Sequence, residues 1–98
     1  MKGQIMHASY VELKVKPDQF EAMKNYTDSI EEKIKAVGMN QFLVLDRGDN
    51  TCLLIVIYNS AAEQEAAAPI AAEVLGEYTQ KFLSESPERK QVEVLFNY

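Results

Sequence analysis

YVELKVKPDQFEAMKNYTDSIEEKIKAVG, residues Tyr10 to Gly38, contains two patterns in direct succession. From Val11 to Lys16 apolar and charged side chains alternate, which is typical of a strand with one buried face. The same alternation, extended backwards, places Ser9 and His7 on the apolar face. Pro17 then ends the strand, because proline donates no ladder hydrogen bond and suits the first turn of a helix.

The second pattern is helical and occupies the rest of this stretch. Its apolar side chains recur at steps of three and four residues, which draws one buried stripe. The members of the stripe are Phe20, Met23, Thr27, Ile30, Ile34 and Val37. Gly38 can adopt the left-handed conformation that stops a helix. We therefore expect a single amphipathic helix between Pro17 and Gly38.

Two further strands are predicted downstream of this helix. Met39–Asp46 and Thr51–Tyr58 are both rich in apolar side chains, and Arg47–Asn50 between them has the composition of a turn. The second run is apolar without alternation, as expected of a central strand covered on both sides. The two runs are thus expected to form a hairpin.

A second helix and a last strand complete the chain. Ser60 and Glu63 have the spacing of a capping box, which indicates a helix start. Pro69 removes one helical hydrogen bond, so we expect a short helical piece followed by a longer one that begins near Pro69. Residues 84–90 are polar and predict a loop, and the alternation in 91–98 predicts the final strand.

The predicted order, strand, helix, strand, strand, helix, strand, indicates an α+β fold. Two right-handed crossovers joined by a hairpin give a ferredoxin-like βαββαβ domain over residues 1–98, with a four-stranded antiparallel sheet and both helices on one face. The central strands are apolar on both sides, so the opposite face of the sheet would expose an apolar patch. We expect a second copy of the chain to cover it, as a homodimer formed through the sheet faces.

Composition excludes several classes of function. Ten basic and fifteen acidic residues give a net charge of -5, and the basic residues are scattered, so we expect no nucleic-acid partner. No apolar run approaches the ~20 residues that cross a bilayer, and no signal peptide is visible, so we expect no membrane association. The single cysteine, Cys52, indicates a reducing compartment, and we expect a cytoplasmic protein.

Three segments give the chain a resemblance to a known superfamily. Val11–Asp18 is similar to the first strand and turn of the dimeric α+β barrel proteins, within them the antibiotic biosynthesis monooxygenase-like domains. Gly38–Phe42 stands where those domains enter their second strand, and Ile57–Ser60 where they carry Glu-x-Trp before a helix cap. In this chain the glutamate falls on Val56 and the tryptophan on Tyr58.

The resemblance implies a homodimer with a cavity in each subunit between the sheet and the helices. Members of the superfamily include cofactor-independent monooxygenases that act on aromatic polyketides, haem-degrading enzymes and proteins of unassigned function. The haem-degrading members place a ligating histidine on the second helix, where this chain has Glu65 and its neighbours. Haem ligation of that type is therefore not expected.

Five residues are candidates for a site, each with a structural alternative. His7 is the one histidine and could transfer protons, or it could be a structural residue near the terminus. Tyr58 could serve as a second catalytic group because it matches the aromatic position of the resembled family. Ser9, Tyr26 and Tyr78 could offer hydroxyls to a ligand in an apolar pocket, or could close the edge of the core.

No metal or cofactor is expected. The acidic pairs Glu31/Glu32 and Glu63/Glu65 lack a histidine or a third carboxylate at a useful spacing, and no nucleotide or flavin motif is present. Three functions remain open. The first is a homodimer that binds a small apolar molecule and performs cofactor-independent monooxygenase or isomerase chemistry on it. The others are a non-catalytic binder of an apolar ligand, such as a fatty acid or an aromatic, and a structural dimer with a filled core.

Overall fold

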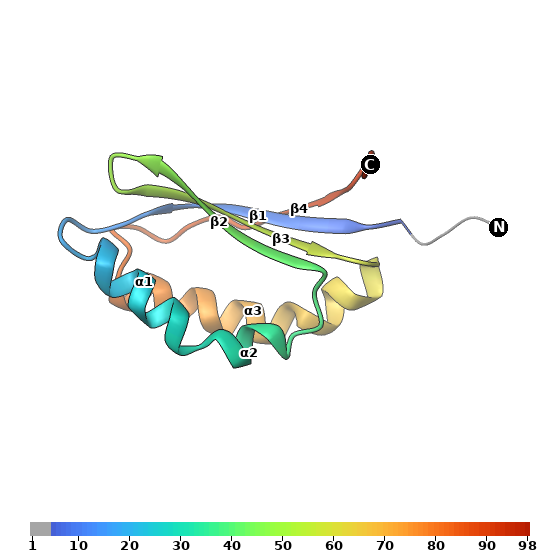
Figure 1. Ribbon diagram of the computed structural model, residues 1–98, viewed down its shortest axis with the longest axis horizontal. Coiled ribbons are helices and arrows are strands. Elements are labelled where there is room, and N and C mark those ends of the chain that lie inside the picture. Colours follow the sequence, from blue (N-terminus) through green and yellow to red (C-terminus); the bar gives the residue numbers. More distant parts are fainter. Residues whose placement is uncertain (1–4) are drawn as a thin grey trace.

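The computed structural model describes residues 5–98, which form a four-stranded antiparallel sheet with three helices on one face (Figure 1). The expected α+β ferredoxin-like fold is therefore confirmed. The elements are β1 (His7–Lys14), α1 (Phe20–Ser29), α2 (Glu31–Lys35), β2 (Gln41–Gly48), β3 (Thr51–Tyr58), α3 (Ala61–Lys81) and β4 (Lys90–Glu93).

The strand order β2-β3-β1-β4 places β1 and β3 in the centre of the sheet. In β1 the side chains of Ser9, Val11 and Leu13 face the helices and are buried, as their alternation predicted. In the register of the sheet Tyr10 lies opposite Ile55, and both point to the face that carries no helix. Figure 1 shows this face uncovered.

The core lies between the sheet and the helices. Its main cluster joins the inward side of β1 and β3 to side chains from α1 and α3 and to the segment after α3. Its buried members are Val11, Leu13, Val15, Met23, Cys52, Tyr78, Phe82 and Leu83. A smaller cluster, formed by Val56, Tyr58 and Ala67, continues the core towards the start of α3. These two clusters fix α3 along the sheet.

The expected single helix after Pro17 is two helices. The helix ends at Ser29 and restarts at Glu31, with Ile30 outside helical geometry at φ -109° and ψ 21°. The hydroxyl of Ser29 donates to the carbonyl of Tyr26 at 2.6 Å, and the Ile30 amide also donates to that carbonyl at 3.2 Å. Such side-chain bonds to the backbone compete with the helical pattern. The apolar stripe nevertheless continues through α2, whose Ile34 is buried.

The expected interruption at Pro69 is wrong. α3 runs without a break from Ala61 to Lys81 with Pro69 inside it. Ala67 and Tyr78, on either side of the proline, are buried against the sheet. Packing at both ends therefore holds the two halves in line and offsets the one hydrogen bond that proline cannot make. One half of the capping box is present, since the Glu63 amide donates to the Ser60 hydroxyl at 3.2 Å. The Glu63 carboxylate accepts from the Asn59 amide at 3.3 Å instead of from the Ser60 amide.

The last strand is shorter than predicted. β4 stops at Glu93, opposite His7, and the Val94 amide makes one further bond to the Met6 carbonyl. Beyond that point Leu95 and Phe96 are 81% and 75% exposed. β1 itself begins at His7, so the end of the chain has no strand to pair with among the described residues. Within residues 5–98, no helix combines the length and the apolar character that a membrane crossing requires.

Candidate ligand cavity

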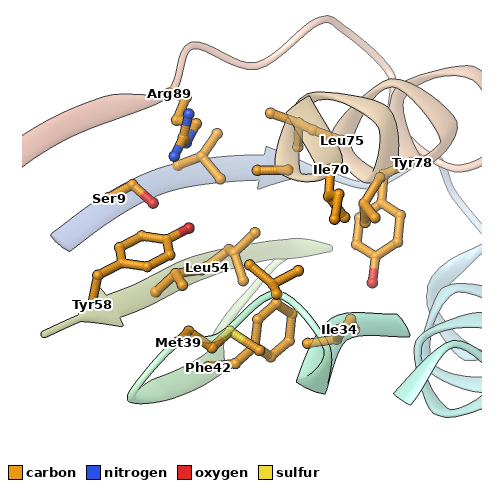
Figure 2. Close-up of a pocket in the computed structure, with 15 residues that line it drawn as sticks. Ser9, Ile34, Met39, Phe42, Leu54, Tyr58, Ile70, Leu75, Tyr78 and Arg89 are labelled. Carbon is orange, nitrogen blue, oxygen red and sulfur yellow. The ribbon is translucent and has the colours of Figure 1, made fainter. Parts of the chain in front are cut away.

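An apolar cavity lies between the sheet and the helices, in the concave space of the fold (Figure 2). Side chains of β1, β2 and β3 form one wall, α2 and the loop after it form a second wall, and α3 forms a third. The lining residues are Ser9, Val11, Ile34, Val37, Met39, Phe42, Leu54, Val56, Tyr58, Ile70, Ala71, Val74, Leu75, Tyr78 and Arg89.

The cavity has a volume of about 60 Å³. A single water molecule needs ~10–15 Å³ by this kind of measure, so several waters, or one small organic molecule, would fill the space. Sites for drug-sized ligands are larger, at roughly 300–1,000 Å³. The cavity as it stands therefore fits a compact ligand of about one ring.

Three polar side chains gather at one end of this cavity, namely Ser9, Tyr58 and Arg89 (Figure 2). Ser9 and Tyr58 are diagonal neighbours on the inward face of the sheet, because Ser9 pairs with Val56. Both are buried, at 4% and 1% exposure. The Tyr58 ring projects into the cavity with its hydroxyl directed towards the Ser9 side.

Arg89 reaches the same end from the other edge of the sheet. It lies directly before β4, where Lys90 pairs with Tyr10, and the alternation of the strand turns Arg89 towards the helices. Its Nη2 atom is buried and has no hydrogen-bond partner among residues 5–98. Buried polar atoms in proteins almost always have such a partner, so this nitrogen is an exception that needs an explanation.

Tyr78 lines the opposite end of the cavity, and its hydroxyl points away from the three polar groups (Figure 2). This hydroxyl lies 2.5 Å from Thr27 Oγ1, which itself donates to the Met23 carbonyl at 2.8 Å. Because the Thr27 proton is already used, Tyr78 is the donor in this pair. Burial raises the pKa of Tyr78. Tyr78 thus supplies the cavity with its ring rather than with a hydroxyl.

Tyr26 does not line the cavity. Its hydroxyl donates to Glu77 Oε1 at 2.7 Å, and its ring meets the ring of Tyr78 edge-on at a centroid distance of 5.8 Å. The hydrogen bond to the Glu77 carboxylate, assisted by burial, raises the pKa of Tyr26 to about 12. Tyr26 joins α1 to α3 on the far side of Tyr78, and the structure does not bring it together with Ser9 and Tyr58.

His7 begins β1 and pairs with Tyr58 on β3 and with Glu93 on β4. Side chains of residues that pair directly lie on the same face of a sheet, so His7 is a neighbour of Tyr58. It is half-buried and does not line the cavity. The structure therefore places His7 beside Tyr58 in the sheet and outside the cavity lining.

Residues 5–98 contain no cluster of three or more histidine, cysteine, aspartate or glutamate side chains that could hold a metal ion. Cys52 is buried in β3, and desolvation raises the pKa of its thiol. A thiol of this kind packs as a small apolar group.

The site residue that sequence reasoning missed is Arg89. It belongs to a segment that reads as a polar loop, SESPERK, and nothing in its composition separates Arg89 from Lys90. The alternation of side chains along β4 indicates the face to which Arg89 points, because Arg89, Gln91 and Glu93 share one face. The alternation in 91–98 follows apolar residues such as Val92, whose side chain faces the uncovered side of the sheet.

Comparisons with known proteins agree with this architecture. No family model matches the sequence, and no curated protein does. A solved protein of unknown function from Nitrosomonas europaea has 25% identity and a TM-score of 0.81, over 99% of this chain and 96% of that one. A second protein from Nitrosomonas europaea, named "putative antibiotic biosynthesis monooxygenase", has 22% identity and a TM-score of 0.75, over 98% and 95% of the two chains.

A haem-degrading protein from Mycobacterium tuberculosis, solved free of haem, has 14% identity and a TM-score of 0.63, over 97% of each chain. These similarities extend over nearly the whole length of both partners in each pair. The chain therefore shares the fold of these solved proteins, and this fold is the one that the resemblance implied.

Proposed function

We propose that this protein is a homodimer that binds a small apolar molecule in the cavity and performs cofactor-independent, monooxygenase-like chemistry on it. The observation that carries the proposal is the apolar cavity itself, into which the Tyr58 hydroxyl projects. Apolar walls with a few placed polar groups are the usual form of a small-molecule site. The names of two similar folds, the second Nitrosomonas europaea protein and the Mycobacterium tuberculosis protein, support an oxidative function.

The residues of the chain would contribute positioning and proton transfer. The walls exclude water and hold the ligand in one orientation. The reacting groups are then already aligned, which lowers the entropic cost of the reaction. The Tyr58 hydroxyl accepts the proton of a hydroxyl group on the bound ligand and passes its own proton to His7. His7, its neighbour across the sheet, returns the proton to solvent, because His7 is half-buried and Tyr58 is buried.

The dimer would form through the uncovered face of the sheet. Most outward side chains of the central part of the sheet are apolar, and charged side chains such as Glu12, Lys14 and Lys90 stand among them. Several of the apolar ones remain well exposed in the single chain. They are Tyr10, Leu43, Leu45, Leu53, Ile55, Ile57 and Val92. A second copy packed on this face would bury them in the manner of two stacked sheets.

The alternative is a non-catalytic binder of the same kind of ligand. It is favoured by one observation, namely that no carboxylate or imidazole lines the cavity. A carrier needs the apolar walls alone, whereas an enzyme needs Tyr58 to act.

Turnover separates the two functions. We expect the wild type to consume oxygen with a small phenol or hydroquinone from a panel of single-ring compounds. Tyr58→Phe should lower kcat about 100-fold, because a positioned proton-transfer group contributes that much or more, while ligand affinity changes less than about 3-fold. The measurement is oxygen uptake beside isothermal titration calorimetry.

Tyr98→Phe is the matched control, since Tyr98 is fully exposed and lies outside the cavity. It should leave both readings unchanged. A wild type that binds ligand but consumes no oxygen with any compound would favour the carrier. Full turnover by Tyr58→Phe would exclude Tyr58 as the catalytic group.

A further inference from the structure

Arg89 lines the cavity with a guanidinium nitrogen that has no hydrogen-bond partner among residues 5–98. Arg89 forms no ion pair among residues 5–98, although Glu85 and Glu88 nearby pair with Lys14 and Lys90. Its Nη2 is buried without a partner at the polar end of the cavity. The chain has fifteen acidic and ten basic residues. A shortage of carboxylates therefore does not explain why Arg89 has no ion pair.

A guanidinium in this position has few ways to satisfy its N–H donors. It presents five N–H donors in one plane and has no acceptor atom, so only an acceptor group can satisfy it. A buried N–H donor without a hydrogen-bond partner is unfavourable, and an acceptor that enters the cavity relieves the cost. Ser9 and Tyr58 add two hydroxyl donors at the same end (Figure 2). Together the three side chains present hydrogen-bond donors, and no carboxylate, to a ligand that enters the cavity.

We propose that the ligand of this cavity is a small aromatic acid whose anionic group binds to Arg89, Ser9 and Tyr58. This inference rests on the proposed ligand-binding function and adds the class of ligand. The planar guanidinium matches a carboxylate, with the two hydroxyls as further donors. The ring of the acid lies against Leu54 and Val74, towards Tyr78 at the apolar end.

The volume and composition of the cavity agree with this class. A space that holds several waters accepts one substituted ring but not a long acyl chain, so a single-ring acid fits better than a fatty acid. Apart from Ser9, Tyr58, Tyr78 and Arg89, every lining side chain is apolar. The anionic group therefore has one place to bind.

Benzoate and its neutral isostere benzamide test the proposal, by isothermal titration calorimetry on the full chain. The wild type should bind benzoate about 10- to 100-fold more tightly than benzamide, since a charge-assisted hydrogen bond is much stronger than a neutral one. In Arg89→Met this preference should disappear while the affinity for benzamide stays within about 3-fold. The retained affinity for benzamide shows that the variant is folded.

Lys90→Met is the matched control, because it removes the same charge from the next residue, whose side chain is exposed. It should keep the preference for benzoate. Equal affinities of the wild type for the two probes would overturn the anion site and leave the proposed function standing. Failure of both probes to bind would contradict the proposed function and this inference with it. Loss of the preference in both variants would show a general charge effect and would also overturn the site.

Discussion

At the scale of single residues, the tyrosines of this chain have different roles that their sequence positions do not distinguish. Tyr26, Tyr58 and Tyr78 each stand in an apolar pattern, and each was a reasonable candidate for a ligand-facing hydroxyl. The structure shows two of these hydroxyls bonded to the protein, one to Glu77 and the other to Thr27. No hydrogen bond joins the hydroxyl of Tyr58 to another of residues 5–98, and this side chain lines the cavity.

The hydrogen bond of Tyr26 makes stability depend on pH in the alkaline range. Its pKa is raised from 10.0 to about 12 in the folded chain. Between these values the folded state keeps the proton and the unfolded state loses it, so the free energy of unfolding falls as pH rises from 10 to 12. Below pH 10 both states are protonated and the contribution is fully present.

Tyr26→Phe should therefore show a smaller loss of Tm between pH 10 and pH 12 than the wild type, as measured by circular dichroism. An absorbance titration of the phenolates should lose a late-titrating component in this variant. Tyr98→Phe, at an exposed position, is the control and should keep the late-titrating component of Tyr26. An alkaline profile of Tyr26→Phe identical to that of the wild type would exclude the bond to Glu77 as the cause.

At the scale of elements, periodic patterns predicted the strands and helices that bury one face. The alternation in β1 and the helical stripe before Gly38 are repeated signals, so the elements and their inward residues followed from the sequence. The break at Ser29 was not predicted, because it depends on a single hydroxyl and its choice of backbone partner. Periodicity contains no information about such a bond.

The errors at Pro69 and at the last strand have a different origin. Both predictions used local rules, and in both the outcome depends on distant residues. The continuity of α3 follows from its burial against the sheet, and the end of β4 follows from where β1 begins. Arg89 was missed for the same reason, because its burial requires α3 and the sheet to be assembled around it. The fold could thus be predicted from the sequence, and so could Ser9 and Tyr58 as candidate residues, whereas the position of Arg89 beside them could not.

At the scale of the whole molecule, the sheet has one face covered by helices and one face without a cover (Figure 1). Tyr10, Leu45 and Val92 on the open face are 37%, 44% and 44% exposed. A typical stable interface buries ~800 Å² on each partner. The open face of a four-stranded sheet is the natural place for such an interface in this fold.

Ile55→Glu tests the proposed dimer. Ile55 lies between Tyr10 and Leu43 across the outer face, so a carboxylate there would be buried unpaired in a sheet-to-sheet interface. Sedimentation velocity at micromolar concentration should show the wild type at twice the 11.1 kDa chain mass and the variant at one chain mass. Ala72→Glu, on the exposed side of α3, should stay dimeric. A monomeric wild type would contradict the proposed assembly.

The central claim is that the space between the sheet and the helices is a ligand site, and methyl NMR tests it most directly. A carbon-proton correlation spectrum, recorded during a titration with benzamide, reports on both faces of the sheet at once. We expect saturable shifts for methyl groups of Val11, Leu54 and Val74, which line the cavity, and none for Leu45 and Val92 on the outer face. Shifts confined to the outer face, or no saturable shift at any methyl group, would contradict the account.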